Sequence, residues 1–211
     1  EGLFPRTSKS ACRRMKLLST EECDEVHRRF DAAIELRNIA EPGKNKIHAY
    51  LPRKGLSCRF LPKDLLPFHN DDPDYIDDVI VWRDAGIEMF LQQNQVENLI
   101  AWGCCGDYLK QCVLTPFNEE SRHLCKQTFI IIPIFFCAPN LEFYMIFDGD
   151  YFCTAVQSRD LMLELDSSLG GYERVRREYI EYMEDFVAGL GEYHTRLLIG
   201  LADLSEAKPL A

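Results

Sequence analysis

A group of cysteine and histidine residues in the middle of the chain has the side-chain types that bind metal. Cys105 and Cys112 precede His123 and Cys125, and thiolates and imidazole are the ligands that Zn²⁺ prefers. These four residues could supply a tetrahedral site from two loops. However, structural zinc sites favour C-x2-4-C pairs, and neither half has that spacing. We therefore expect no cofactor, and we keep a zinc-dependent or zinc-stabilised domain as an alternative.

Two adjacent cysteines suggest a second kind of chemistry. Cys104 and Cys105 are bracketed by Gly103 and Gly106, so a turn there could expose a sulfur to a histidine base. A nucleophilic cysteine needs a lowered pKa and a positioned base, and no local signature of either surrounds this pair. An enzyme with Cys104 or Cys105 as nucleophile is thus an alternative. The simpler interpretation is a tight turn that packs two small residues.

An acidic segment covers residues 71–78, with five aspartates in eight residues. Carboxylates this dense suit Mg²⁺ or Ca²⁺, and His69 with Asp71 and the distant His194 has the residue types of an iron triad. The segment lacks the glycine and the bidentate glutamate of a calcium loop. Helix capping with a solvated charged face explains it more simply. Its candidate partner-binding residues are Asp71, Asp72 and Asp74.

The beginning of the chain is basic, in contrast to the rest. Residues 1–16 contain five lysines and arginines and one acid, which gives this arm a charge of +4. Such an asymmetry indicates an acidic or phosphate-bearing partner, with Arg13 and Arg14 as the most concentrated charges. The alternatives are a flexible tail, or an arm that folds back onto the aspartates. We divide the chain into an arm, residues 1–18, and one domain, residues 19–211.

A helix is predicted directly after this arm. Ser19 and Glu22 form a capping box, which satisfies the amides at a helix start. Apolar residues follow at spacings of three and four, and the predicted helix runs to about Ile39, before Pro42 and Gly43.

The middle of the chain is irregular. Short strand-like segments cover residues 47–51 and 56–61. The stretch from Val79 to Val113 is ambiguous, because residues 79–82 look like a strand while residues 87–100 have helical spacing.

The last third of the chain has a clearer pattern. Three apolar runs within residues 129–156 predict an antiparallel meander, and Pro133 suggests an edge strand or a bulge in the first. Ser158 should cap a short helix, and a longer amphipathic helix should begin near Tyr172. The expected fold is therefore α+β: an N-terminal helix, an irregular mixed middle, the meander and a helical C-terminus.

Composition limits the function further. The chain has 211 residues, 46% of them hydrophobic, and a net charge of −10, which is typical of one globular domain. An acidic surface repels phosphate backbones, so we expect no nucleic-acid binding except through residues 1–16. The longest apolar run is too short to cross a membrane. The nine cysteines, about 4% of the chain, are odd in number and scattered, which favours a reducing intracellular compartment.

No nucleotide-binding loop, paired catalytic carboxylates or catalytic triad is recognisable in the sequence. We therefore predict a non-enzymatic intracellular binding or regulatory domain that engages a protein partner. The cysteine enzyme and the zinc domain stay open as alternatives, and the oligomeric state is not predicted.

Overall fold

The computed structural model describes most of the predicted domain. It covers residues 15–39, 47–53, 56–61, 78–103, 111–116, 133–140, 142–147, 152–186 and 196–201. The helices are α1 (Thr20–Ala33), α2 (Asp78–Gln93), α4 (Arg159–Ser168) and α5 (Tyr172–Phe186). The strands are β1 (Lys16–Leu17), β2 (Ile34–Ile39), β3 (Ile47–Pro52), β4 (Ser57–Leu61), β5 (Asn98–Gly103), β6 (Val113–Pro116), β7 (Ile134–Cys137), β8 (Phe143–Phe147) and β9 (Phe152–Val156). Helices and antiparallel sheets together confirm the α+β class.

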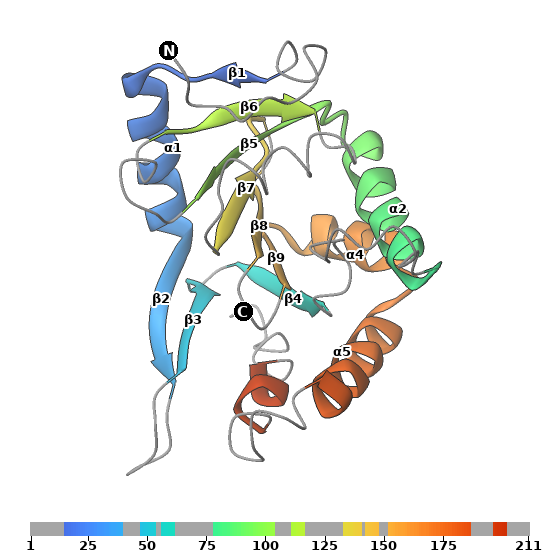
Figure 1. Ribbon diagram of the computed structural model, residues 1–211. Coiled ribbons are helices and arrows are strands. Elements are labelled where there is room, and N and C mark those ends of the chain that lie inside the picture. The colour runs from blue at the N-terminus through green and yellow to red at the C-terminus, as the bar shows by residue number, and fades with distance from the viewer. Residues whose placement is uncertain are drawn as a thin grey trace.

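Seven strands form one antiparallel sheet in the order β1-β6-β5-β7-β8-β9-β4 (Figure 1). The meander is confirmed, with Phe135 opposite Ile146 and Ile146 opposite Cys153. The first strand of the meander lies between β5 and β8, so the expectation of an edge position was wrong. Pro133 directly precedes Ile134, where its missing N–H removes no bond from the ladder.

Helices cover both faces of the sheet, so successive residues of a strand face different cores. Phe135 and Ile146 pack with α1 on one face, whereas Phe136 and Met145 pack with α2 and α4 on the other. This explains why the central strands read as continuous apolar runs rather than as alternating ones. Helix α5 contributes to both cores and lies beside the edge strand β4.

The N-terminal helix begins as predicted and ends earlier than predicted. Ser19 accepts from the Glu22 amide, and the Glu22 carboxylate accepts from the Ser19 amide, which confirms the capping box. The helix ends at Ala33, and β2 continues from Ile34 to Ile39, so the prediction of a helix to Ile39 was wrong. Cross-strand pairing with β3 accounts for this, because an apolar residue at each end of β2 fits a strand as well as a helix.

In the ambiguous stretch from Val79 to Val113, the observed elements differ from those that the local pattern suggests. The strand-like residues 79–82 lie inside α2, and part of the helix-like segment, residues 98–100, lies in β5. Only Ile87, Phe90 and Leu91 keep the helical assignment that their spacing suggested, and all three are buried. Short apolar runs fit either structure, so here the tertiary packing decides.

The C-terminal helices follow the sequence pattern. Ser158 caps α4 by accepting from the Leu161 amide, and α5 begins at Tyr172 after two glycines with positive φ. Val175, Tyr179 and Met183 are the buried face of α5. A further helical segment covers residues 196–201, and the buried Tyr179 hydroxyl donates to the Leu198 carbonyl at 2.8 Å.

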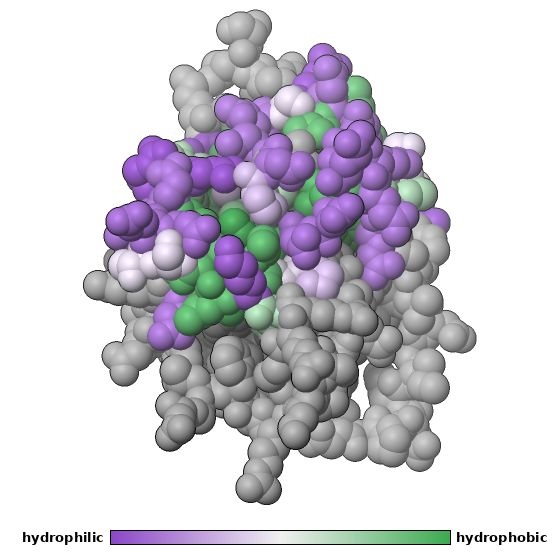
Figure 2. Space-filling view, turned by 90° about the horizontal axis from the view of Figure 1, so that it is seen from above, coloured by the Kyte–Doolittle hydropathy of each residue, from purple (hydrophilic) through white to green (hydrophobic). Residues whose placement is uncertain are grey.

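The surface around the β1 end of the sheet is mostly hydrophilic. Figure 2 shows this side with apolar residues gathered in smaller groups between polar ones. Within the part of the chain that the structure describes, no helix is both long and apolar enough to cross a membrane.

Candidate functional site

Most of the residues singled out from sequence fall outside the described residues. These are Arg13, Arg14, His69, Asp71, Asp72, Asp74, Cys104, Cys105, His123, Cys125 and His194. The acidic, basic and paired-cysteine hypotheses therefore stay predictions. Of the proposed zinc ligands, Cys112 is the one that the structure places.

Cys112 contacts the N-terminal helix. Its amide donates to the Cys23 Sγ at 3.3 Å, and its Sγ lies 3.5 Å from the His27 Nε2. Cys23 and His27 are one helical turn apart, so both side chains lie on the face of α1 that contacts Cys112. Sequence reasoning missed these two residues, although their i,i+4 spacing on an amphipathic helix was a usable signal.

The Cys112 and His27 side chains have the residue types of a nucleophile and its base, but their surroundings oppose activation. Cys112 is fully buried, and burial is the main cause that raises the pKa of its thiol. Burial also lowers the pKa of His27. The His27 and Trp102 rings contact each other edge-on, with their centroids 5.7 Å apart. Both shifts favour neutral groups at neutral pH, whereas an active cysteine requires a thiolate.

The other described cysteines are also buried and reduced: Cys23, Cys58, Cys137 and Cys153. Burial raises the pKa of Cys137 to about 12 and that of Cys153 well above its ordinary value. Among the residues that the structure describes, no group of three or more histidine, cysteine or acidic side chains is arranged to hold a metal ion.

These thiols should therefore react slowly in the folded protein. With iodoacetamide at neutral pH, we expect Cys23, Cys58, Cys112, Cys137 and Cys153 to be modified much more slowly than after unfolding in urea, because each is buried. Peptide mapping by mass spectrometry measures every site in one sample. Rapid labelling of Cys112 would contradict its assignment as an inert thiol.

The same experiment tests the cysteine enzyme. A nucleophile at Cys104 or Cys105 would be labelled selectively against the slow background of the buried thiols, which serve as internal controls. Equal slow labelling at all nine cysteines would remove that alternative.

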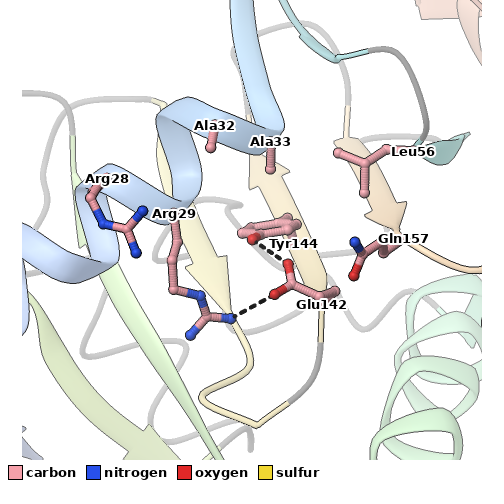
Figure 3. Close-up of a pocket in the computed structure, with 8 residues that line it drawn as sticks. All are labelled: Arg28, Arg29, Ala32, Ala33, Leu56, Glu142, Tyr144 and Gln157. Carbon is pink, nitrogen blue, oxygen red and sulfur yellow. Dashed lines mark hydrogen bonds and ion pairs between the residues drawn. The ribbon is translucent and has the colours of Figure 1, made fainter.

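A different site lies between α1 and the β8 and β9 strands. An open pocket of about 280 Å³ is lined by residues from four separate segments (Figure 3). We call it the α1–β8 pocket, and its lining residues are Arg28, Arg29, Ala32, Ala33, Leu56, Glu142, Tyr144 and Gln157.

Glu142 organises the polar side of this pocket. Its Oε2 accepts from the Tyr144 hydroxyl at 2.8 Å, and its Oε1 lies 3.5 Å from the Arg29 Nη2. Arg29 also donates to the Pro139 carbonyl at 3.3 Å. In Figure 3 the Arg29 and Tyr144 side chains both point toward Glu142. These bonds hold one guanidinium, one carboxylate and one phenol in fixed positions.

The remaining lining residues differ in character. Ala32, Ala33 and Leu56 form an apolar wall, and Gln157 contributes an amide. Arg28 lies at the exposed side, with a side chain that is 70% exposed, and it pairs with Glu25 at 2.6 Å.

The arrangement suits binding better than catalysis. Both Glu142 oxygens are engaged, and burial with the bond to Glu142 raises the pKa of Tyr144, so the phenol stays protonated. Polar groups held in fixed positions beside apolar residues can orient a bound ligand. The sequence predicted the β8–β9 pairing but offered no signal that α1 and Leu56 would meet it, because these parts are far apart in the chain.

Comparison of the chain with protein-family models, with curated proteins and with solved structures finds no match.

Proposed function

We propose that the chain is a binding domain that engages a short acidic segment of a protein partner in the α1–β8 pocket. The observation that carries this proposal is the position of Arg28 and Arg29 beside the apolar wall of an open pocket. An acidic side chain of the partner would meet Arg28, and a neighbouring apolar side chain would pack on Ala32 and Leu56.

Arg28 is the residue best placed to recognise the partner's carboxylate. Its pair with Glu25 is exposed on both sides, with 70% and 53% of the side chains accessible, and such pairs contribute little to stability. A partner's carboxylate could therefore replace Glu25 at low cost. Arginine also binds carboxylates through two parallel hydrogen bonds, as it already does with Glu25.

Arg29 and Glu142 would set the orientation of the bound segment. They are held by Pro139 and Tyr144, so they need little ordering when a ligand binds. The amide of Gln157 can donate to and accept from a peptide backbone. The apolar wall adds contact area of the kind that fills small pockets.

The experiment is a selection of peptides from a random display library against the folded domain. We expect the selected peptides to share an acidic residue next to an apolar one. Arg28→Glu should weaken their binding about tenfold by placing like charges together, and added salt should weaken it as well. Ala32→Trp, which fills the pocket, should abolish it.

Leu163→Trp is the matched control, because Leu163 is 57% exposed on α4, on the opposite side of the sheet. It should leave binding unchanged. Peptides that tolerate Ala32→Trp, or that show no acidic preference, would overturn the proposal. Loss of binding in both tryptophan variants would do the same, because the pocket would then have no special role.

A further inference from the structure

The β2 strand has one edge that no other described strand pairs with. Among the residues that the structure describes, β2 pairs only with β3, in a two-stranded sheet separate from the seven-stranded one. In Figure 1, β2 forms the outer side of this ribbon, next to α1. Leu36, Arg37 and Asn38 are exposed there, with 53% of Leu36 accessible. β2 has no proline or lysine, two residues that often protect open edges from pairing.

The register with β3 shows which backbone groups face outward. The Arg53 amide donates to the Ala33 carbonyl at 2.8 Å, so this pair is a hydrogen-bonded one. Hydrogen-bonded pairs alternate along an antiparallel ladder. The backbone N–H and C=O groups of Glu35, Arg37 and Ile39 therefore point toward β3. The backbone groups of Ile34, Leu36 and Asn38 therefore point to the open edge. Pro52, which has no N–H, lies opposite Ile34 in a pair that is not hydrogen-bonded, so its missing donor costs the ladder nothing.

We propose that this edge pairs with the β2 edge of a second copy of the chain, antiparallel, with Leu36 opposite Leu36. In this register each Leu36 amide donates to the Leu36 carbonyl of the other strand. Each Asn38 amide donates to the other Ile34 carbonyl. The Ile34 amide takes no part, because it already donates to the Phe30 carbonyl at the end of α1.

Charge selects the same register. With Leu36 at the two-fold axis, each Glu35 lies directly opposite Arg37 of the other copy, and opposite charges across a strand pair are stabilising. Within one chain Glu35 also pairs with Arg37 and Arg53, so the pairing across the axis would extend an existing network of opposite charges. A shift of two residues would place Glu35 opposite Glu35, or Arg37 opposite Arg37. The sequence of β2 is thus complementary to itself around Leu36, as a two-fold interface requires. The two Leu36 residues lie next to each other at the axis.

The test is a charge exchange measured by sedimentation equilibrium. We expect the unmodified chain to show a monomer–dimer equilibrium that depends on concentration. Arg37→Glu places glutamates opposite each other, and Glu35→Arg places arginines opposite each other. Each change acts twice in a symmetric dimer, so each should weaken dimerisation about tenfold. An equal mixture of the two variants should dimerise again, because every opposing pair is then of opposite charge.

The control is Arg177→Glu, which makes the same charge change at an exposed position of α5 and should leave dimerisation unchanged. Rescue in the mixture requires both variants to be folded, so it separates a lost interface from a lost fold. A chain that stays monomeric at millimolar concentration would overturn the proposal. A mixture no better than its components would also overturn it, as would an equal effect of Arg177→Glu.

Discussion

Replacing Asp166 with alanine should lower the free energy of unfolding by about 3–5 kcal/mol, because it leaves a buried guanidinium without its carboxylate. The Arg59 Nε and Nη2 donate to the two Asp166 oxygens at 2.7 and 2.6 Å, and the side chains are only 12% and 10% exposed. The Tyr172 ring lies 4.4 Å from the Arg59 guanidinium carbon. Urea unfolding followed by circular dichroism measures the change.

Two further variants serve as controls for the Asp166→Ala prediction. Glu25→Gln removes the carboxylate of an exposed pair, and it should leave the urea midpoint unchanged. The double variant Arg59→Met with Asp166→Leu should be much more stable than Asp166→Ala alone, since neither charge is then buried unpaired. If Asp166→Ala behaves like Glu25→Gln, then water replaces the carboxylate and the pair does not stabilise the fold.

The Arg59–Asp166 pair explains how the C-terminal helices attach to the sheet. Arg59 belongs to the edge strand β4, Asp166 to α4 and Tyr172 to the first turn of α5. The pair and the Tyr172 ring therefore join three elements at the start of α5. Sequence reasoning did not find it, because its two members are 107 residues apart.

The parts of the fold that could be predicted are those set by neighbouring residues. The Ser19 and Glu22 capping box, the Ser158 cap and the spacing of Val175, Tyr179 and Met183 are local patterns, and the structure confirms them. The boundary between α1 and β2 could not be predicted. Pairing with β3, a tertiary interaction, determines that Ile34 starts a strand.

The site was less accessible to prediction than the fold. The sequence drew attention to cysteines near Cys112, yet Cys112 contacts Cys23 and His27, which belong to the N-terminal helix about 85 residues earlier in the chain. The α1–β8 pocket combines α1 with Glu142 and Tyr144, and these groups are brought together by sheet topology. Residue types alone cannot indicate such a juxtaposition.

Gly86 is a second position where one substitution should have a large effect. It lies inside α2, where alanine would normally stabilise a helix by about 1 kcal/mol relative to glycine. A Cβ at Gly86, however, would lie 2.8 Å from the Ser168 carbonyl oxygen and 3.1 Å from Leu169 Cδ2. The closest atom belongs to the backbone of α4, so a side-chain rotation cannot relieve the contact.

We therefore expect Gly86→Ala to destabilise the protein, because overpacking of about 1–3 kcal/mol outweighs the gain in helix propensity. Gly200→Ala is the matched control. Gly200 lies in the helical segment 196–201, and a Cβ there would have no atom within 4 Å, so alanine should stabilise by up to about 1 kcal/mol. Thermal unfolding should thus shift to lower temperature for the first variant and to higher temperature for the second. Stabilisation by both would show that α2 and α4 separate easily, and that their close contact at Gly86 does not limit the fold.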